Sequence, residues 1–288
     1  MTYLVECYDV GGTNIRGALI KKNGTFVRTA HCRTARKKPL FFIEQIAKMS
    51  KLLRNYIPSG FNVISVSIAL PGPVKNNILV EAPAMKIKGV DVAKKLSKKI
   101  KEPIFLINDM KAAARAELKF GVGKKTKNFY IITISTGIGS GLVINGKTVD
   151  SFYGEFGHDI LERYSKKAKR CNCGRKGCWV AMSSGLAVEK MKKKNMSFND
   201  FYRTNKKAVS LIRDYNAQGI GNMLNAFSVD TIVIMGSMGV EQFKRIIPSR
   251  KEIEKYTLNK VPSIVPTKLG DTIGLLGAYI YALEKMRK

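Results

Sequence analysis

The order of apolar and polar positions in the first part of the chain predicts three short strands, then a helix, then buried strands that alternate with helices. The first two strands are joined by a glycine turn, and the second and third by Lys22-Asn23-Gly24, a turn type that favours hairpins. Strands are predicted over 3–8, 15–20, 26–32, 63–69 and 104–107. Helices are predicted over 40–56, 90–100 and 111–120, where apolar residues recur at helical spacing.

The second half of the chain begins with a similar pattern. Strands are predicted over 129–135, 141–144 and 230–235. Helices are predicted up to about residue 227, after 236–239, and over 272–285. Glycine turns follow the first strand of each half, at Gly11–Gly12 and at Gly137–Gly139. This recurrence predicts a duplicated α/β lobe whose two copies have diverged in sequence.

Composition indicates a globular chain of 288 residues with 45% hydrophobic residues, long enough for two domains. No apolar run reaches the roughly 18 residues of a membrane span, and no secretion signal precedes the first strand. We therefore expect a cytoplasmic protein with no membrane partner. The net charge of +30 fits either a polyanion partner or a solvated basic surface. Lysines are spread in short clusters without a nucleic-acid-binding motif, so we expect small anionic ligands rather than nucleic acid.

Two glycine-rich turns carry candidate phosphate-binding chemistry. The first lies in Asp9-Val10-Gly11-Gly12-Thr13-Asn14-Ile15-Arg16, and the second in Ser135-Thr136-Gly137-Ile138-Gly139-Ser140-Gly141. Glycines let backbone N–H groups approach phosphate oxygens, and Thr13 adds a hydroxyl donor. Asp9 could hold a nucleotide's magnesium through water. Each turn taken alone could be an ordinary hairpin, but two such turns in two similar halves favour a nucleotide site.

Asn108-Asp109 directly follows the predicted strand 104–107. An aspartate at the carboxyl end of a strand is well placed to act as a general base. The same residue could instead cap the helix predicted over 111–120, because aspartate is a favoured N-cap. Position in the sequence leaves both roles open.

A cluster of metal-ligand residues lies in the second half. His158 is followed by Cys171, Cys173 and Cys178, and one imidazole with three thiolates would complete a closed tetrahedral zinc site. Cys7 and Cys32 stand apart in strand-like segments and are expected to be buried thiols. Clustered cysteines in a cytosolic chain indicate a metal before a disulfide.

Together these residues resemble the ROK family (repressors, open reading frames and sugar kinases) of the actin-like ATPase and hexokinase superfamily. The resemblance covers nearly the whole chain. It rests on the two phosphate turns, Pro71-Gly72-Pro73-Val74, Asn108-Asp109, Gly154-Glu155-Phe156-Gly157-His158, the cysteine string 171–178, Gly236, and the terminal Leu269-Gly270, Gly274 and Gly277-Ala278. It implies a two-lobed α/β actin-like ATPase (ribonuclease H-like) fold. Residues 1–109 with 275–288 would form the small lobe, and 110–274 the larger lobe with a zinc-binding loop at 155–180.

The resemblance also implies an ATP-dependent sugar kinase that uses Mg²⁺ and Zn²⁺, and a homodimer or homotetramer. Asp109 would take the proton from the 6-hydroxyl of a hexose. Sugar contacts would come from Gly72, Asn108, Asp109, Glu155 and His158, with His158 also bound to zinc together with Cys171, Cys173 and Cys178. Mg-ATP would lie against Asp9, Gly11, Gly12, Thr13, Asn14, Arg16, Thr136, Gly137, Gly139 and Gly236.

Two positions depart from the family pattern. Val180 stands where family kinases usually carry a glutamate two residues after the last cysteine, and Ala84 stands where they often carry an asparagine. Both changes remove polar contacts to the acceptor. We therefore keep three alternatives: a hexose kinase of the glucokinase type, an N-acetylmannosamine or other N-acetylhexosamine kinase, and a sugar-responsive regulator. The regulator is disfavoured because Asp9 lies too near the start of the sequence for a preceding winged helix.

Overall fold

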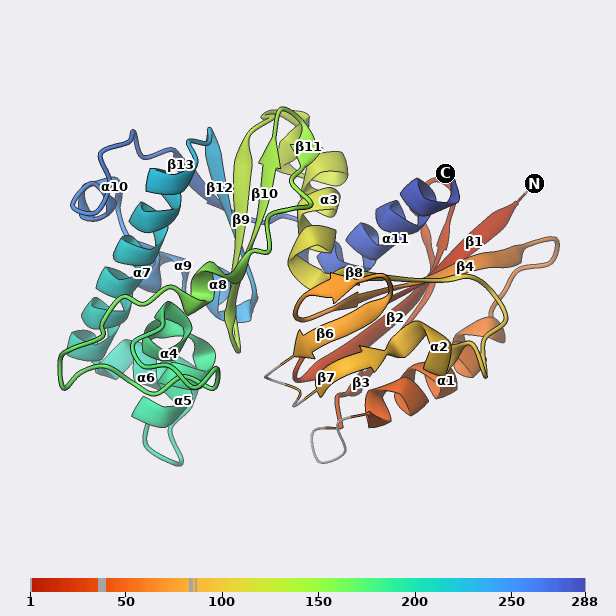
Figure 1. The fold of residues 1–288 in the computed structure, drawn as a ribbon, viewed down its shortest axis with the longest axis horizontal. Helices are drawn as coiled ribbons and strands as arrows, with labels where there is room; N and C mark the ends of the chain where they lie inside the picture. The colour runs from red at the N-terminus through yellow and green to blue at the C-terminus, as the bar shows by residue number, and fades with distance from the viewer. Residues whose placement is uncertain (1, 36–39, 83–84, 86, 288) are drawn as a thin grey trace. The chain divides into compact units, whose positions relative to one another are not determined.

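The computed structural model describes residues 2–35, 40–82, 85 and 87–287, which form two compact units (Figure 1). Unit 1 comprises residues 1–120 and 269–288, and unit 2 comprises residues 121–268. This division differs from the boundary expected between residues 109 and 110. The helix α3 (Asp109–Phe120) packs on the terminal helix α11 (Ile273–Met286), and both therefore belong to unit 1.

Unit 1 contains a sheet with the strand order β3-β2-β1-β4-β8. The three strands at the start of the chain form the predicted antiparallel meander, and the last two strands run parallel to β1. Their bounds are β1 Tyr3–Val10, β2 Asn14–Lys21, β3 Phe26–Arg33, β4 Asn62–Leu70 and β8 Ile104–Asn108. Parallel strands end at the same edge of a sheet, so the residues that follow β1, β4 and β8 lie along one edge.

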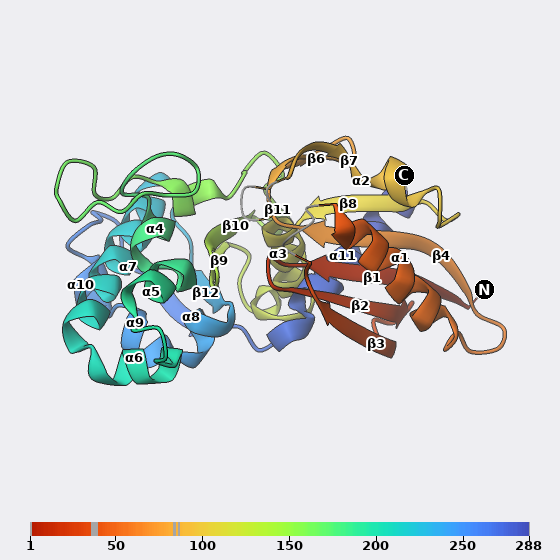
Figure 2. The same ribbon diagram turned by 90° about the horizontal axis from the view of Figure 1, so that it is seen from below.

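Helices cover both faces of this sheet (Figures 1 and 2). Alternate residues of β1 point to opposite faces. Leu4 and Tyr8 join a core with the helix α1 (Phe41–Arg54), while Val5 and Cys7 join a second core with α11. The predicted helix over 40–56 is confirmed. Since Asp9 follows the alternation of Val5 and Cys7, it lies on the α11 face.

A small antiparallel sheet in unit 1 was missed by the sequence pattern. It consists of β5 Val74–Lys75, β6 Ile78–Ala82 and β7 Ile87–Asp91. The helix predicted over 90–100 is wrong at both ends, because β7 runs to Asp91 and α2 spans only Val92–Leu96. Asp91 sets the start of α2, since its carboxylate accepts a hydrogen bond from Lys94 N at 2.8 Å.

Unit 2 contains a second sheet with the order β11-β10-β9-β12-β13. A three-strand antiparallel meander is again followed by two strands parallel to the first. The bounds are β9 Phe129–Ile134, β10 Ile138–Ile144, β11 Lys147–Thr148, β12 Thr231–Met235 and β13 Ser263–Pro266. Each sheet thus has the same order and directions, which confirms the predicted duplication. β10 begins three residues earlier than predicted, and β13 was not predicted.

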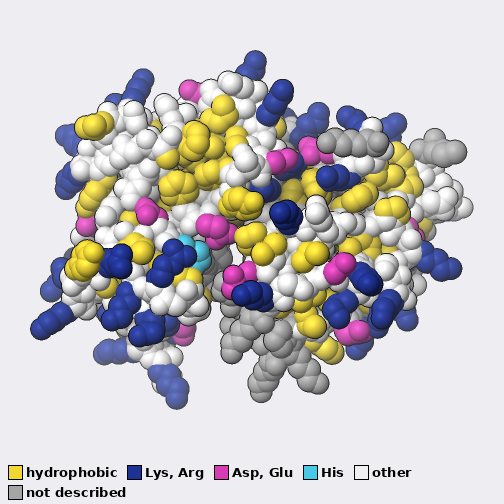
Figure 3. Space-filling model, in the orientation of Figure 1, with side chains coloured by type: hydrophobic (Ala, Val, Ile, Leu, Met, Phe, Trp, Pro, Cys, Tyr) yellow, Lys and Arg dark blue, Asp and Glu magenta, His cyan; other side chains and the backbone are white. Residues whose placement is uncertain are grey.

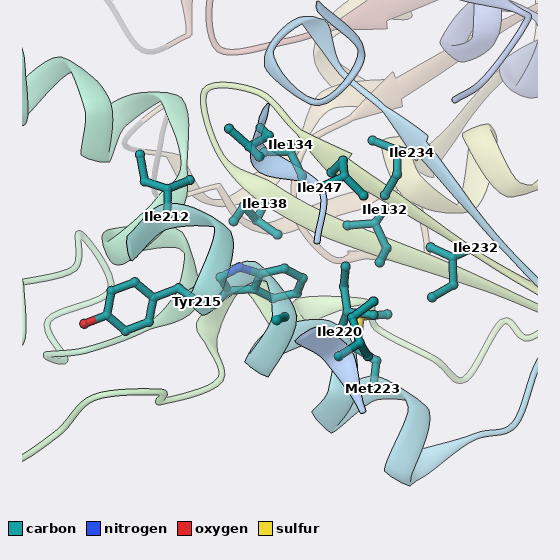
Figure 4. Close-up of a cluster of buried hydrophobic side chains, with 14 of the residues drawn as sticks. Ile132, Ile134, Ile138, Ile212, Tyr215, Ile220, Met223, Ile232, Ile234 and Ile247 are labelled. Atoms are coloured by element: carbon teal, nitrogen blue, oxygen red, sulfur yellow. The ribbon is translucent and has the colours of Figure 1, made fainter. Parts of the chain in front are cut away.

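The core of unit 2 lies between its sheet and α7 (Lys206–Ala226), where isoleucines from the strands meet Ile212, Tyr215 and Ile220 of the helix (Figure 4). The expected helical region before residue 227 is confirmed. The remaining helices of unit 2 are α4 Trp179–Ser183, α5 Gly185–Met191, α6 Phe198–Thr204, α8 Ser237–Glu241, α9 Phe243–Ile246 and α10 Arg250–Ile253. Among the described residues, no helix is long and apolar enough to cross a membrane.

A buried ion-pair network stabilises the α1 face of unit 1. Glu6 is fully buried in β1, where it accepts hydrogen bonds from the hydroxyl of Tyr8 and from Arg54 Nε at 2.9 Å. Arg54 also forms a bidentate pair with Glu102, with both N–O distances at 2.8 Å. The guanidinium therefore ties the end of α1 to the centre of the sheet and to the segment before β8.

We predict that Arg54→Met lowers the free energy of unfolding by about 3–5 kcal/mol, because it leaves the Glu6 carboxylate buried without its partner. Lys99→Met is the matched control. It breaks an exposed pair with Glu44 and should cost at most about 1 kcal/mol. Urea unfolding measures both losses, and equal losses in the two variants would contradict the role assigned to Arg54.

Candidate active site and metal centre

The first phosphate turn joins β1 to β2. Gly11 N donates to Asn14 O at 2.8 Å, which closes the turn. Thr34 holds it from outside, with its hydroxyl donating to Gly11 O at 2.7 Å and its N–H donating to Thr13 O at 2.9 Å. A Cβ placed on Gly12 would meet no atom within 4 Å. The turn therefore leaves room beside Gly12 for a ligand to approach the backbone.

Asp9 lies beside this turn, at the end of β1. It pairs across the strands with Arg16, whose guanidinium forms an ion pair with Asp271 at 2.6 Å. A Cβ on Gly274, in the first turn of α11, would stand 2.4 Å from Asp9 Cγ, so only glycine permits this approach. Burial raises the pKa of Asp9 to about 6, and the positive charge of Arg16 acts against that rise. A nearby cation would favour the charged carboxylate.

Asn108 and Asp109 have separate tasks at the start of α3. Asn108 Oδ1 accepts from the N–H groups of Met110 and Lys111 at 3.0 and 3.1 Å, so Asn108 caps the helix. Its Nδ2 donates to Gly72 O and to Asp109 Oδ1, both at 3.1 Å. Asp109 is partly exposed and accepts from Met110 N at 2.8 Å. The cap that the sequence allowed for Asp109 is thus supplied by its neighbour.

The second phosphate turn joins β9 to β10 in unit 2. It is closed by Ser135 N donating to Gly137 O at 2.9 Å, and α5 begins against it, with Gly185 N donating to Ser135 O at 2.7 Å. Gly236 has φ 84°, and a Cβ there would stand 2.7 Å from Ile134 O. Thr136 and Gly137 lie in the turn. Gly139 lies in β10 opposite Thr133.

The segment Glu155–His158 forms a 3₁₀ turn that packs directly on β10. A Cβ on Gly154 would stand 1.9 Å from Ser140 O, and one on Gly157 would stand 2.1 Å from Ile138 O, so both positions require glycine. Glu155 Oε2 lies 4.0 Å from His158 Nε2. Burial raises the pKa of Glu155, whereas burial, together with the charge of Arg175, lowers the pKa of His158 and favours a neutral imidazole.

The four predicted metal ligands come together in unit 2. His158 Nδ1 and the sulfurs of Cys171, Cys173 and Cys178 all lie within 4.8 Å of one another. The Nδ1–Sγ distance to Cys171 is 3.5 Å, and the Cys173–Cys178 sulfur distance is 3.7 Å. Tetrahedral zinc would set these separations at about 3.5 and about 3.8 Å. The donor set therefore fits a closed zinc site, and its use of Nδ1 leaves Nε2 for another partner.

A hydrogen-bonded tryptophan fixes the metal cluster to the core of unit 2. Trp179 follows the last cysteine, is fully buried, and donates from Nε1 to Asn216 Oδ1 at 2.9 Å. A Cβ on Gly219 would stand 2.4 Å from the indole, so glycine makes the space in α7. Sequence reasoning missed this contact, and it also missed Asp271 beside Arg16. The chain has one tryptophan, and its position directly after the last cysteine was the sequence signal that this residue could anchor the cluster.

Comparison with known proteins identifies the family. The sequence profile of the ROK family matches residues 5–285, and the chain belongs to this family. It is 30% identical over 289 residues to an N-acetylmannosamine kinase of Haemophilus influenzae, covering 94% of this chain and 92% of that protein. It is 28% identical over 297 residues to a xylose repressor of Bacillus spizizenii, and the match covers 96% of this chain and 76% of that protein.

The fold agrees with this family. The structure matches a ROK family glucokinase from Streptomyces griseus, solved with glucose and AMPPNP, with a TM-score of 0.78 at 21% identity. The match covers 98% of this chain and 99% of the other. The expected α/β fold of two units is therefore confirmed, and the cluster of one histidine and three cysteines is consistent with the expected zinc site.

We predict about one zinc ion per chain by metal analysis, and loss of that ion in Cys178→Ser, because three ligands remain. Loss of the metal should also lower the melting temperature, since binding energy contributes to folding. Cys32→Ser is the control: this half-buried thiol lies in unit 1, outside the cluster, and its loss should leave the zinc content unchanged. A folded wild-type protein purified without zinc, and gaining no stability from added zinc, would contradict the assignment.

Proposed function

We propose that this chain transfers the γ-phosphate of Mg-ATP to the 6-hydroxyl of a hexose. The observation that carries the proposal is the position of Asp109. It follows a parallel strand, it is partly exposed, and Asn108 takes over the helix cap. An aspartate in this position can accept the proton of an attacking hydroxyl. The family includes proteins named as sugar kinases, which supports the same reaction.

The residues of unit 1 would serve the nucleotide and the proton. The turn Gly11–Thr13 offers backbone N–H groups to phosphate oxygens, and the Thr13 hydroxyl adds a donor. Asp9 would hold Mg²⁺ through water. When bound, this ion would neutralise part of the negative charge of the phosphates. Arg16 lies opposite Asp9 across β1 and β2, and the Asn14 carbonyl closes the turn. Asp109 would hold the proton of the sugar hydroxyl at its carboxylate.

The residues of unit 2 would serve the outer phosphates, the adenosine and the sugar. Thr136 and Gly137 would offer the second turn, and Gly139 follows in β10. Gly236, which packs closely on the end of β9, would lie beside the adenosine. Glu155 and His158 Nε2 would accept or donate hydrogen bonds at sugar hydroxyls. When bound, Zn²⁺ would hold the imidazole through Nδ1 and so fix the direction of Nε2.

Asn108 is a less available sugar contact than the resemblance implied. Its amide accepts two hydrogen bonds and donates two within unit 1, and Gly72 O is one of its partners. An amide has two acceptor sites and two donor hydrogens. A sugar hydroxyl would therefore have to replace one of these bonds, so we assign Asn108 mainly to positioning Asp109.

We expect residues of unit 2 to determine which sugar is accepted. Val180 lies in α4 and packs on the unit core, with Cγ2 3.9 Å from where a Cβ of Gly137 would stand. Because valine is smaller than glutamate and apolar, it would make room for a substituent such as the methyl of an N-acetyl group. N-acetylmannosamine is thus a second candidate, favoured by Val180 and by the kinase relative. Ala84, the other departure from the family pattern, lies outside the described residues.

We predict sugar-dependent release of ADP from Mg-ATP in a panel of glucose, mannose, fructose, N-acetylmannosamine and N-acetylglucosamine. In Asp109→Asn the turnover should fall by about 10²–10⁴-fold, because the base is lost, while nucleotide binding stays unchanged. Asp91→Asn is the control, since this residue only caps α2 and asparagine caps equally well. Near-normal turnover in Asp109→Asn would rule out its assignment as base.

A further inference from the structure

One basic surface segment of unit 2 has no role in the proposed reaction. Seven of the fourteen residues from 163 to 176 are Lys or Arg, and none is Asp or Glu. We call this segment the basic knuckle. Its cations are Arg163, Lys166, Lys167, Lys169, Arg170, Arg175 and Lys176, and all of them are exposed. Figure 3 shows Lys and Arg side chains gathered on the face of unit 2 that carries α4 to α6 and the loop before them.

Cations without a carboxylate partner are common in this basic chain, but the basic knuckle gathers seven of them within fourteen residues. In unit 2, Lys192, Arg203, Arg213 and Arg250 each form an ion pair with a carboxylate. Within the described part of the chain, none of the seven knuckle cations does so. Arg170 and Lys176 instead face each other across an isolated antiparallel bridge. Like charges directly opposite are unfavourable, and a bound anion would relieve that repulsion.

The metal cluster presents these cations on an ordered backbone. Cys171 and Cys173 lie between Arg170 and Arg175, and Cys171 N donates to Arg175 O at 2.7 Å. Gly177 N donates to Lys169 O at 2.9 Å, which joins the residues before the first cysteine to those before the last cysteine. A surface that is already ordered loses less conformational entropy on binding than a flexible basic tail.

One aromatic ring stands among the cations. Tyr164 is 93% exposed, although a tyrosine usually buries most of its ring. The guanidinium of Arg163 lies 5.6 Å from its ring centroid. An exposed ring beside cations that contact phosphates is the arrangement on which a nucleic-acid base stacks.

Although the sequence alone favoured small anionic ligands over nucleic acid, we propose that the basic knuckle binds single-stranded nucleic acid, through contacts from its cations to phosphates and a base stacked on Tyr164. The proposal is independent of the kinase reaction. A chain of inorganic phosphates would use the cations but not the ring. A membrane surface would require further exposed apolar side chains, and the knuckle offers Tyr164 alone among its large apolar or aromatic residues.

The test measures binding of a fluorescent oligouridylate to the full-length, zinc-loaded protein by anisotropy at several salt concentrations. Arg170→Gln combined with Lys176→Gln should weaken binding about tenfold at low salt and reduce the salt slope by roughly 1.4, since each contact to a single strand contributes about 0.7. Lys95→Gln combined with Lys98→Gln removes the same charge from exposed positions of unit 1 and should change binding little. Equal losses in both double variants, or no binding by the wild type, would overturn the proposal.

The aromatic contact is tested separately. Tyr164→Ser should weaken oligouridylate binding by about tenfold, while Tyr164→Phe should keep it, because stacking needs the ring and not the hydroxyl. Unchanged zinc content in each variant shows that the knuckle is still folded. If Tyr164→Ser binds as well as wild type, and polyphosphate displaces the oligonucleotide with equal affinity, the site is for phosphate chains and the proposal fails.

Discussion

Two candidate site carboxylates of unit 1, Asp9 for the nucleotide's metal and Asp109 as the base, depend on the close packing of α11 against β1 and α3. A Cβ on Gly274 would overlap the carboxylate of Asp9, and a Cβ on Gly277 would stand 1.9 Å from Ala112 O in α3. The last helix therefore approaches the first strand and the helix that begins at Asp109 at the same time. Asp9 and Asp109 are 100 residues apart, yet one helix surface determines the position of both. Substitutions on this surface would therefore shift both Asp9 and Asp109.

Unit 2 has a separate sheet of the same topology, and the metal cluster lies beside that sheet. Its meander again has a glycine turn after the first strand, but the segment after β11 departs from the repeated plan and carries the metal cluster. Glycines at 154 and 157 let this segment lie directly on β10, and Trp179 fixes its other end to α7. The cluster thus joins a rigid sheet to a rigid helix. That arrangement holds the imidazole of His158 between the sheet and the helix.

Local sequence signals predicted much of the fold. The first meander, the glycine turns, α1 and the metal ligands follow from alternation, turn chemistry and ligand spacing, all of which act over a few residues. Contacts between distant segments left no such signal. The pairing of Arg16 with Asp271, the seat for Trp179 at Gly219, and the packing of α3 on α11 that moved the unit boundary to Phe120 depend on tertiary structure. The small sheet β5–β7 was missed because its strands are short and half exposed.

At Asn108-Asp109 the sequence allowed two roles for one aspartate. Both side chains suit a helix cap, and only the hydrogen bonds to Met110 and Lys111 assign the cap to Asn108. That assignment supports the view of Asp109 as the base for a sugar hydroxyl. The amide of Asn108 also donates to Asp109 and to the Gly72 carbonyl, whereas its predicted contact with a sugar stays a prediction.

The most direct measurement is phosphorus and carbon NMR of the product formed from Mg-ATP and the best sugar acceptor. The account predicts a new phosphate ester whose phosphorus couples to carbon 6 of the sugar, in amounts that match the ADP formed. Release of inorganic phosphate alone, or an ester at another carbon, would contradict the proposed transfer to the 6-hydroxyl.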